Sequence, residues 1–450
     1  MGKRRFAAKN VTGWKATVAV AMANYIEAGS IIAAASSLTL WQAYLNIDSM
    51  GVGLLSALSA NALGAAIGAL IGGPLTDKFG RKFIFSYDLL VYMIGVALIA
   101  TSVNFPMLLI GTIITGLAVG AGVPVSWTYI AEESPKHKRA AHVGTAQLAW
   151  SIGPAITFML AVLVAPLGLF GSRLIFFHLL VIAFVAWYIR RGLDESKIWE
   201  EQQQQDKQDA AEGKIKPNII KELFTLKANR QALILLLGIY LFWNLTAGAM
   251  GYFMPYIYEN VGGLSTAQAN MLQAFLWFLT VVTTYFLFMK LGDKVSRRSL
   301  FGIGAVMGVV AWIVLTFMPM TWPTLITFVV LWGAAAGIGA QAFYALWTSE
   351  LFPTRYRASA QGLMYFIVRS GIAVWSFALP IVMDTLGFTV AGIVMIAFLV
   401  IHLVIGLALA PNTQGKTLQQ IESERYGGAL LDNEKTAKEP AVLNKGFEVK

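Results

Sequence analysis

Long apolar runs alternate with short polar segments along most of this chain. Each run is long enough to cross a bilayer, because about 20 apolar residues at ~1.5 Å each span a hydrocarbon core of ~30 Å. The runs fall at residues 16–41, 52–74, 83–101, 106–130, 142–166, 173–191, 229–258, 267–290, 299–318, 323–350, 358–383 and 387–410. This pattern predicts an all-α membrane protein with twelve transmembrane helices, arranged as six, a polar linker and six.

The polar segments divide the chain into parts. Residues 1–191 predict an N-terminal six-helix bundle and residues 229–410 a C-terminal six-helix bundle. Between them, residues 192–228 are rich in glutamate and glutamine, which favour helix. We therefore expect a helical cytoplasmic linker there, with a disordered linker as the alternative. Residues 411–450 form a polar cytoplasmic tail, whose end we expect to be mostly disordered.

Composition and charge agree with this reading. Hydrophobic residues make up 57% of the 450 residues and charged residues only 13%, against about 25% charged in a soluble domain. The net charge of +10 would suggest a nucleic-acid partner in a soluble chain, but here the loops predicted to face outward contain no lysine or arginine. This distribution follows the positive-inside rule. We expect a multi-pass protein of the cell inner (plasma) membrane, with both termini in the cytoplasm and no nucleic-acid partner.

Two charged motifs occur twice. Asp77-Lys78-Phe79-Gly80-Arg81-Lys82 follows the second apolar run, and Asp293-Lys294-Val295-Ser296-Arg297-Arg298 follows the eighth. A Glu-x-x-Pro-x-x-x-Arg element follows the fourth run and again the tenth. The acids and arginines concerned are Asp77, Arg81, Glu132 and Arg139 in the first half and Asp293, Arg297, Glu350 and Arg357 in the second. The recurrence indicates two homologous halves, and parallel repeats of this kind occur in transporters whose solute site lies between the halves.

The repeated charges predict a cytoplasmic gate. Glu132 and Glu350 should lie at the C-terminal ends of helices, where the helix dipole disfavours a carboxylate unless a cation is near. Arginine suits this role because it can hold a carboxylate through two hydrogen bonds at once. We predict Asp–Arg–Glu networks that hold the bundles together when the inner mouth is shut. The alternative is that these residues are topology signals and solvated charges, worth about 0–1 kcal/mol each.

These motifs resemble those of the major facilitator superfamily, and within it those of the sugar porter family. The turn at 72–82 is similar to the superfamily signature between helices two and three, and Tyr129 with Glu132, Pro135 and Arg139 is similar to the family pattern after helix four. Further resemblances are Gln147-Leu148 with Gly153, Asp194-Glu195-Ser196 and Pro411-Asn412-Thr413-Gln414-Gly415. The resemblance implies the major facilitator fold of two pseudo-symmetric six-helix bundles, and a secondary transporter that works by alternating access.

The substrate region departs from the sugar porter pattern. Where that family has a Gln-Gln pair and a Ser-Gly-Ile-Asn run in helix seven, this chain reads Phe242-Trp243-Asn244-Leu245-Thr246-Ala247-Gly248-Ala249. The tryptophan expected in helix ten is Ala345, with Trp347 nearby instead. A standard hexose site is therefore not predicted, and another polyhydroxylated molecule, a sugar acid or another organic acid stays open.

Two ionisable residues inside apolar runs are the candidates for proton coupling. Such residues are costly in lipid and normally face the bundle interior. Glu27 lies well inside the first run, where the resemblance implies a coupling acid, and burial favours the protonated form of a carboxyl group. The alternative for Glu27 is a structural carboxylate. Arg369 lies deep in the eleventh run, and three roles stay open for it: holding an anionic solute group, pairing with an acid such as Glu27, or a purely structural role.

Other polar residues in the runs are candidates for substrate binding. Amides hydrogen-bond hydroxyl groups, and tryptophan rings stack on the apolar faces of sugars. The candidates are Gln147, Trp243, Asn244, Thr246, Gln273, Trp277 and Gln341. Each of them has the alternative role of bonding a neighbouring helix. We assign Asp88 to the cytoplasmic charges, and His178 and His402 to packing, and we expect no metal site.

The sequence favours a transporter over other classes of membrane protein. It contains no cysteine and no paired acids or nucleophile–base set that would predict an enzyme, and no phosphate-binding Gly-x-x-x-x-Gly-Lys-Ser/Thr loop. A receptor would not need two homologous halves. We predict a monomer in contact with lipid, without a cofactor, that takes up a sugar, polyol or sugar acid together with a proton. An organic-acid symporter or a multidrug exporter of the same fold is the alternative, and uniport is also open.

Overall fold

The structure, a computed structural model, describes residues 13–133, 139–212, 219–289, 295–413, 416 and 420–427, and these form helices and no strands. Within them, nine segments are long and apolar enough to cross a membrane, and one of the nine, Leu148–Arg190, contains two helices. Two shorter apolar helices, Leu63–Gly72 and Trp322–Ile338, complete the set. Each of the twelve predicted runs therefore contains an apolar helix, which confirms the all-α membrane fold.

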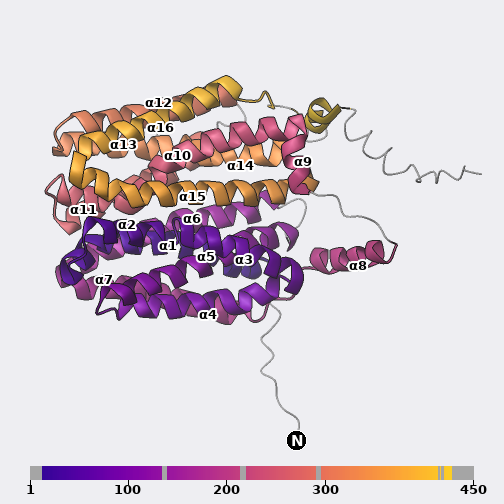
Figure 1. Ribbon diagram of the computed structural model, residues 1–450, viewed down its shortest axis with the longest axis horizontal. Coiled ribbons are helices and arrows are strands. Elements are labelled where there is room, and N and C mark those ends of the chain that lie inside the picture. Colours follow the sequence, from indigo (N-terminus) through magenta and orange to yellow (C-terminus); the bar gives the residue numbers. More distant parts are fainter. Residues whose placement is uncertain are drawn as a thin grey trace, which may run out of the picture.

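The two halves of the chain form two bundles that lie side by side, as Figure 1 shows by colour. The N-terminal bundle contains α1 (Trp14–Leu45), α2 (Ser49–Ala57), α3 (Leu63–Phe79), α4 (Arg81–Ala100), α5 (Phe105–Glu133), α6 (Arg139–Val164) and α7 (Gly168–Arg190). The segment between the bundles contains α8 (Lys197–Ala211) and α9 (Ile219–Thr225). The C-terminal bundle contains α10 (Lys227–Asn260), α11 (Thr266–Thr283), α12 (Arg297–Phe317), α13 (Trp322–Ile338), α14 (Ala340–Leu351), α15 (Thr354–Leu386) and α16 (Phe388–Leu409).

Two of the apolar runs are broken into two helices each. The second run forms α2 and α3, and the tenth forms α13 and α14 on either side of Gly339. At the first break, the Ser59 hydroxyl donates to the Ser56 carbonyl and accepts the Asn61 N–H. Short polar side chains compete with a helix for backbone groups in this way. Non-helical backbone at membrane depth is tolerated only where protein surrounds it, and both Ser59 and Asn61 are buried.

The bundles contact each other through equivalent elements. The second apolar run of each half packs against the fifth run of the other half. Thus α2 and α3, which form the second run, contact α15 of the eleventh, and α11 of the eighth run contacts α6 of the fifth. The first elements, α1 and α10, also contact each other. This exchange is the arrangement expected of two homologous halves related by an axis along the membrane normal. It places residues in the middle of α1, α6, α10, α11 and α15 around a common centre.

Successive membrane spans run antiparallel, which gives the molecule two ends. We call the end that carries Gly80, α8 and residues 420–427 the linker face, and the end that carries the turns at Gly168, Gly263 and Gly387 the distal face. In Figure 1 the linker face lies to the right, where α8 extends from the bundles. The described parts of the repeated charged motifs lie at helix ends at the linker face.

The turn between α3 and α4 is held by Glu195, which follows α7 in the chain. Gly80 has a φ of +89°, a conformation that glycine adopts readily. Glu195 accepts the main-chain N–H groups of Arg81 (2.9 Å) and Lys82 (3.0 Å) at the start of α4. A carboxylate there satisfies two donors that have no partner within the helix and complements the positive end of its dipole. The linker segment therefore helps to fix the charged turn of the N-terminal bundle.

Candidate functional site

Glu27 and Arg369 meet between the two bundles. Glu27 lies near the middle of α1 and Arg369 near the middle of α15, and Arg369 Nη2 donates to Glu27 Oε1 at 2.6 Å. The Glu27 and Arg369 side chains are 2% and 11% exposed. The contact is one of the three roles that the sequence left open for Arg369. Removing one partner of a buried pair leaves an uncompensated charge, at a cost of about 3–5 kcal/mol, so the pair ties the two bundles together.

Arg369 also donates hydrogen bonds to Asn61. Asn61 lies in the break between α2 and α3, where Arg369 Nη1 donates to its main-chain oxygen at 2.8 Å and to its Oδ1 at 3.3 Å. Asn61 Nδ2 in turn donates to the carbonyl of Gly248 on α10 at 2.8 Å. Asn61 therefore bonds two helices of the opposite bundle. It is not among the predicted site residues, although an asparagine within an apolar run carries the signal that selected the others.

Aromatic side chains surround the pair. The Tyr365 hydroxyl donates to Glu27 Oε1 at 3.4 Å, and the Arg369 guanidinium lies 4.9 Å from the centre of the Tyr365 ring. Trp150 of α6 also hydrogen-bonds the Glu27 side chain. Trp150 contacts the predicted residue Trp277 of α11 edge to face, with ring centres 5.4 Å apart. The carboxylate thus has partners from both bundles, and Trp277 lies one side chain away from it.

The predicted substrate residues of α10 lie on two sides of that helix. Asn244 Nδ2 donates to the main-chain oxygen of Tyr240 at 2.9 Å, and the Trp243 ring is stacked with the Tyr240 ring at 6.5 Å. Tyr240 packs against the cluster that contains Val368 and Ile372, which flank Arg369 on α15. Thr246 is buried and donates to the carbonyl of Met395 on α16, inside the C-terminal bundle.

Three glutamines complete the predicted set. Gln273 is buried, and its Nε2 donates to the Tyr258 hydroxyl at 3.4 Å, within the C-terminal bundle. Gln341 is half-buried in the first turn of α14. The Gln147 side chain lies outside the described part of the chain. The structure thus brings Trp277, Trp243 and Asn244 close to the central pair, whereas Thr246 and Gln273 bond within one bundle.

The bundles are also joined nearer the distal face. Glu259 Oε2 of α10 accepts a hydrogen bond from Thr39 of α1 at 2.6 Å and another from Thr266 of α11 at 3.0 Å. The Ser49 hydroxyl donates to Asp384 Oδ2 at 3.1 Å. In both cases an acid of the C-terminal bundle accepts from a hydroxyl of the N-terminal bundle. These residues are not among the predicted site residues, because they lie close to predicted loops rather than deep in the runs.

At the linker face, the structure describes one pair of the predicted gate. Arg297 Nη1 donates to both carboxylate oxygens of Glu350, at 2.8 and 2.9 Å, and to the Thr413 hydroxyl at 2.9 Å. This contact joins α12, α14 and the segment after α16 within the C-terminal bundle. Arg81 contributes its main-chain N–H to Glu195 as described above. The side chains of Asp77, Glu132, Arg139 and Arg357, and the whole of Asp293, lie outside the described residues.

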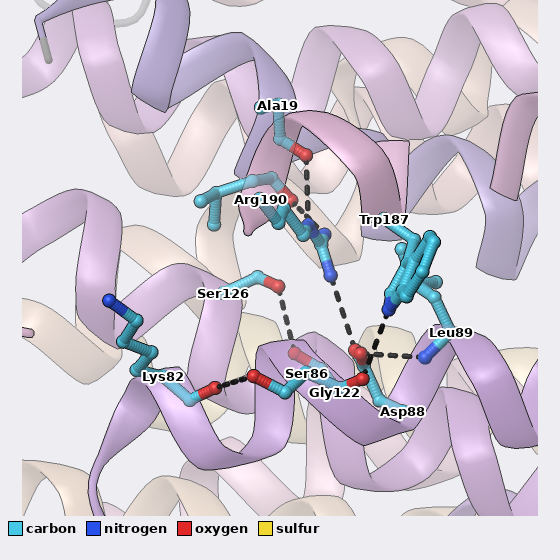
Figure 2. Close-up of polar contacts among 10 residues, drawn as sticks. Ala19, Lys82, Ser86, Asp88, Leu89, Gly122, Ser126, Trp187 and Arg190 are labelled. Atoms are coloured by element: carbon cyan, nitrogen blue, oxygen red, sulfur yellow. Dashed lines mark hydrogen bonds and ion pairs between the residues drawn. The ribbon is translucent and has the colours of Figure 1, made fainter. Parts of the chain in front are cut away.

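A second buried ion pair lies inside the N-terminal bundle (Figure 2). Arg190 Nη1 donates to Asp88 Oδ2 at 3.2 Å, and the two side chains are 0% and 3% exposed. Arg190 also donates to the main-chain oxygens of Ala19 (3.0 Å) and Val20 (2.8 Å) on α1. Asp88 Oδ1 accepts the N–H of Leu89. Asp88, assigned to the cytoplasmic charges by its position in the sequence, thus pairs within the bundle interior and joins α1, α4 and α7.

His178 and His402 each contact a neighbouring helix. His178 Nε2 lies 2.7 Å from the Tyr25 hydroxyl, and His402 Nδ1 lies 2.7 Å from the carbonyl oxygen of Ile239. In the part of the chain that the structure describes, no group of three or more His, Cys, Asp and Glu residues could hold a metal ion.

A small cavity lies among helices of the N-terminal bundle and Tyr252 of α10. It has a volume of about 30 Å³ and lies next to Ser30, Leu38, Trp41 and Tyr252. This volume suits about one water molecule, whereas small-molecule sites usually measure several hundred Å³. Polar groups from both bundles meet instead around Glu27 and Arg369.

Comparison with known proteins identifies the family. Residues 41–424 match the sequence profile of the family described as sugar (and other) transporter. The chain belongs to this family. It is therefore a secondary transporter with several membrane spans, and the resemblance noted in the sequence motifs is confirmed.

Relatives of this sugar transporter family member agree in length and fold. It is 45% identical over 417 residues to the minor myo-inositol transporter IolF of Bacillus subtilis (strain 168), covering 92% of this chain and 94% of that protein. It is 27% identical over 417 residues to probable polyol transporter 4 of Arabidopsis thaliana, covering 83% and 77%. The crystal structure of a D-xylose–proton symporter superposes with a TM-score of 0.72 at 18% identity, covering 89% and 98% of the chains, which shows the shared fold.

Proposed function

We propose that this transporter takes up a polyol of the myo-inositol class together with a proton, across the plasma membrane and with both termini in the cytoplasm. The observation that carries the proposal is the Glu27–Arg369 pair, which joins the bundles at their centre. The solute class is supported by the 45% identity to a myo-inositol transporter over nearly the whole chain. Proton coupling is supported by the burial of a carboxylate at the interface that must open and close.

Glu27 is the proton-binding group in this proposal. As a carboxylate it accepts hydrogen bonds from Arg369 and Tyr365 of one bundle and from Trp150 of the other. Protonation removes its charge and weakens the contact with Arg369, because charge-assisted hydrogen bonds are about twice as strong as neutral ones. The charge of Glu27 therefore biases how firmly the bundles are joined. A group that binds protons differently in two conformations couples proton movement to their exchange.

The solute binds next to this pair. A polyol can donate hydroxyl hydrogen bonds to Glu27 and accept them from Arg369 and Asn244. The indole rings of Trp150, Trp243 and Trp277 offer apolar faces on which the C–H side of a cyclitol ring can pack. These groups come from α6, α10 and α11 as well as from α1 and α15. Solute and proton are thus recognised at one place, between the bundles.

An organic anion fits this site less well than a neutral polyol. A solute carboxylate needs a cation whose charge is not already compensated, because a buried charge is costly without a partner of opposite charge. Arg369 is the arginine predicted for such a role, and it is paired with Glu27 at 2.6 Å. An anion would therefore have to displace Glu27. A labelled dicarboxylate belongs in the assay as the competing solute class.

The experiment is uptake of labelled myo-inositol into proteoliposomes with an acidic exterior. We expect accumulation above equilibrium that a protonophore abolishes. Glu27→Gln should still exchange solute in counterflow but no longer concentrate it. Asp384→Asn is the matched control, because it alters another acid that bonds across the bundles but lies near the distal face; it should accumulate solute normally. The absence of accumulation by the parent excludes symport, and parental accumulation by Glu27→Gln excludes Glu27 as the coupling group.

A further inference from the structure

We infer that Asn61 is a positioning residue for proton coupling, which keeps Arg369 attached to the N-terminal bundle when Glu27 takes up a proton. This inference rests on the proposed function of Glu27 and adds a residue to it. Asn61 offers Arg369 two acceptors, its main-chain oxygen and its Oδ1, and neither changes its charge with pH. Glu27 offers an acceptor whose charge does change.

The two nitrogens at the end of Arg369 divide between these partners. Nη2 donates to Glu27 on α1, and Nη1 donates to Asn61 in the break between α2 and α3. Among the residues that the structure describes, the other titratable groups that act on Arg369 are Tyr365 of its own helix and Tyr240 of α10. Both are phenols, which are uncharged at neutral pH. When Glu27 is protonated, the hydrogen bonds from Arg369 to Asn61 are therefore unaffected, and they still join Arg369 to the N-terminal bundle.

The local backbone explains why Asn61 can do this. In a continuous helix its carbonyl would accept the N–H four residues later, but the chain is not helical between α2 and α3. The carbonyl oxygen is consequently available to the guanidinium. The side-chain amide is anchored at the same time, because Nδ2 donates to Gly248 of α10. Broken helices in transporters place free backbone carbonyls at ion sites in the same way, and here the cation is a guanidinium.

The structure predicts opposite effects for two substitutions. Asn61→Ala removes Oδ1 and the anchor to Gly248, so Arg369 depends more on the charged form of Glu27. Protonation of Glu27 then requires a lower pH, and we expect the pH of half-maximal uptake to fall by about one unit. Asn61→Asp adds a carboxylate that can pair with Arg369 in place of Glu27. Glu27 is then protonated more easily, and we expect the midpoint to rise.

The experiment measures uptake of labelled myo-inositol into proteoliposomes as a function of external pH, with counterflow at one pH to show that each variant is folded. Asn24→Ala is the matched control, because Asn24 is a buried amide that accepts a hydrogen bond from Trp127 inside one bundle. Its midpoint should equal that of the parent. The inference is supported if the pH of half-maximal uptake falls for Asn61→Ala and rises for Asn61→Asp. A merely structural role would lower uptake without moving this pH in opposite directions.

Two results would overturn it: parental midpoints for the Asn61 variants, or shifts of both in one direction. If Asn61→Ala does not fold, the isosteric Asn61→Asp decides alone, and a midpoint at or below that of the parent excludes the role. Glu27→Gln separates this inference from the proposed function. If Glu27→Gln loses accumulation while the Asn61 variants titrate like the parent, only the role of Asn61 is wrong. If Glu27→Gln still accumulates solute, both are wrong.

Discussion

Asp88–Arg190 and Glu27–Arg369 are both buried ion pairs, but the first lies within one bundle and the second between two. The Arg190 side chain contacts α1 and α4, through two main-chain oxygens, Asp88 and the ring of Phe85. Arg369 lies on α15 and donates to Glu27 and Asn61 in the opposite bundle. The chemical groups are the same in the two pairs, and the burial of the carboxylates is similar.

The two ion pairs differ in whether their contacts change when the bundles move. When the bundles rotate as rigid bodies, the contacts of Arg190 stay intact, because α1, α4 and α7 belong to one body. The contacts of Arg369 must change, because its partners belong to the other body. A buried pair within a bundle therefore contributes to stability and internal alignment, whereas a buried pair between bundles contributes to the conformational equilibrium as well. Position relative to the interface, rather than residue type, separates the two roles.

The largest effect on solute accumulation is expected when the interface pair loses its cation. Arg369→Met leaves Glu27 buried without its main partner, which favours the protonated form and prevents proton release. We expect accumulation of labelled solute to fall at least about tenfold, which corresponds to roughly 1.4 kcal/mol. The double variant Glu27→Gln/Arg369→Met should recover thermal stability but not accumulation. If accumulation returns in the double variant, the pair is structural and the comparison fails.

Breaking the pair inside the bundle should affect stability and leave coupling intact. Arg190→Met leaves Asp88 buried and uncompensated, at a cost of about 3–5 kcal/mol. We expect a clear drop in the thermal unfolding midpoint in detergent. Asp88→Asn/Arg190→Met should recover part of the loss, because no charge is then left unpaired. The pH dependence of uptake by the folded fraction should match that of the parent, and a shifted pH midpoint would contradict the division of roles.

The smallest effect is expected from crowding the pair without removing a charge. A Cβ atom on Gly122 would clash with Asp88 Oδ2, so Gly122→Ala must displace the carboxylate. Overpacking of this kind costs about 1–3 kcal/mol, measurable as a lower thermal midpoint with unchanged coupling. Gly251→Ala is the matched control, because a Cβ there would meet nothing within 4 Å. Equal midpoints for the two variants would show that the Asp88 carboxylate is not held tightly.

The sequence predicted most of the fold and part of the candidate site. The twelve apolar runs and the repeated charged turns led to the two-bundle membrane fold, because helix formation in lipid depends mainly on local apolarity. Glu27 and Arg369 were selected because an ionisable residue in an apolar run is rarely tolerated without a role. The pairing between Arg297 and Glu350, expected from the repeated motif, is present in the structure. All of these predictions used signals that lie within a single run or turn.

Other features required the folded chain. The breaks in the second and tenth runs were not predicted, because an interrupted helix is as apolar as a continuous one. Asn61 was not selected, and its importance depends on the break that frees its carbonyl. Arg190 was not among the predicted site residues because it lies at the end of its run, although it is fully buried in the structure. Thr246 and Gln273 were predicted at the solute site, but in the structure they bond within the C-terminal bundle.

The sequence by itself determined that this chain crosses the membrane as two homologous groups of six helices and that Glu27 and Arg369 lie deep in apolar runs. Hydropathy and charge suffice for that, because each helix satisfies its own backbone and each charged turn must stay near water. Only the tertiary structure decided which groups meet. Glu27 and Arg369 are 342 residues apart in the sequence, and their contact depends on how α1 and α15 pack across the interface. The local patterns of the two segments do not contain that information.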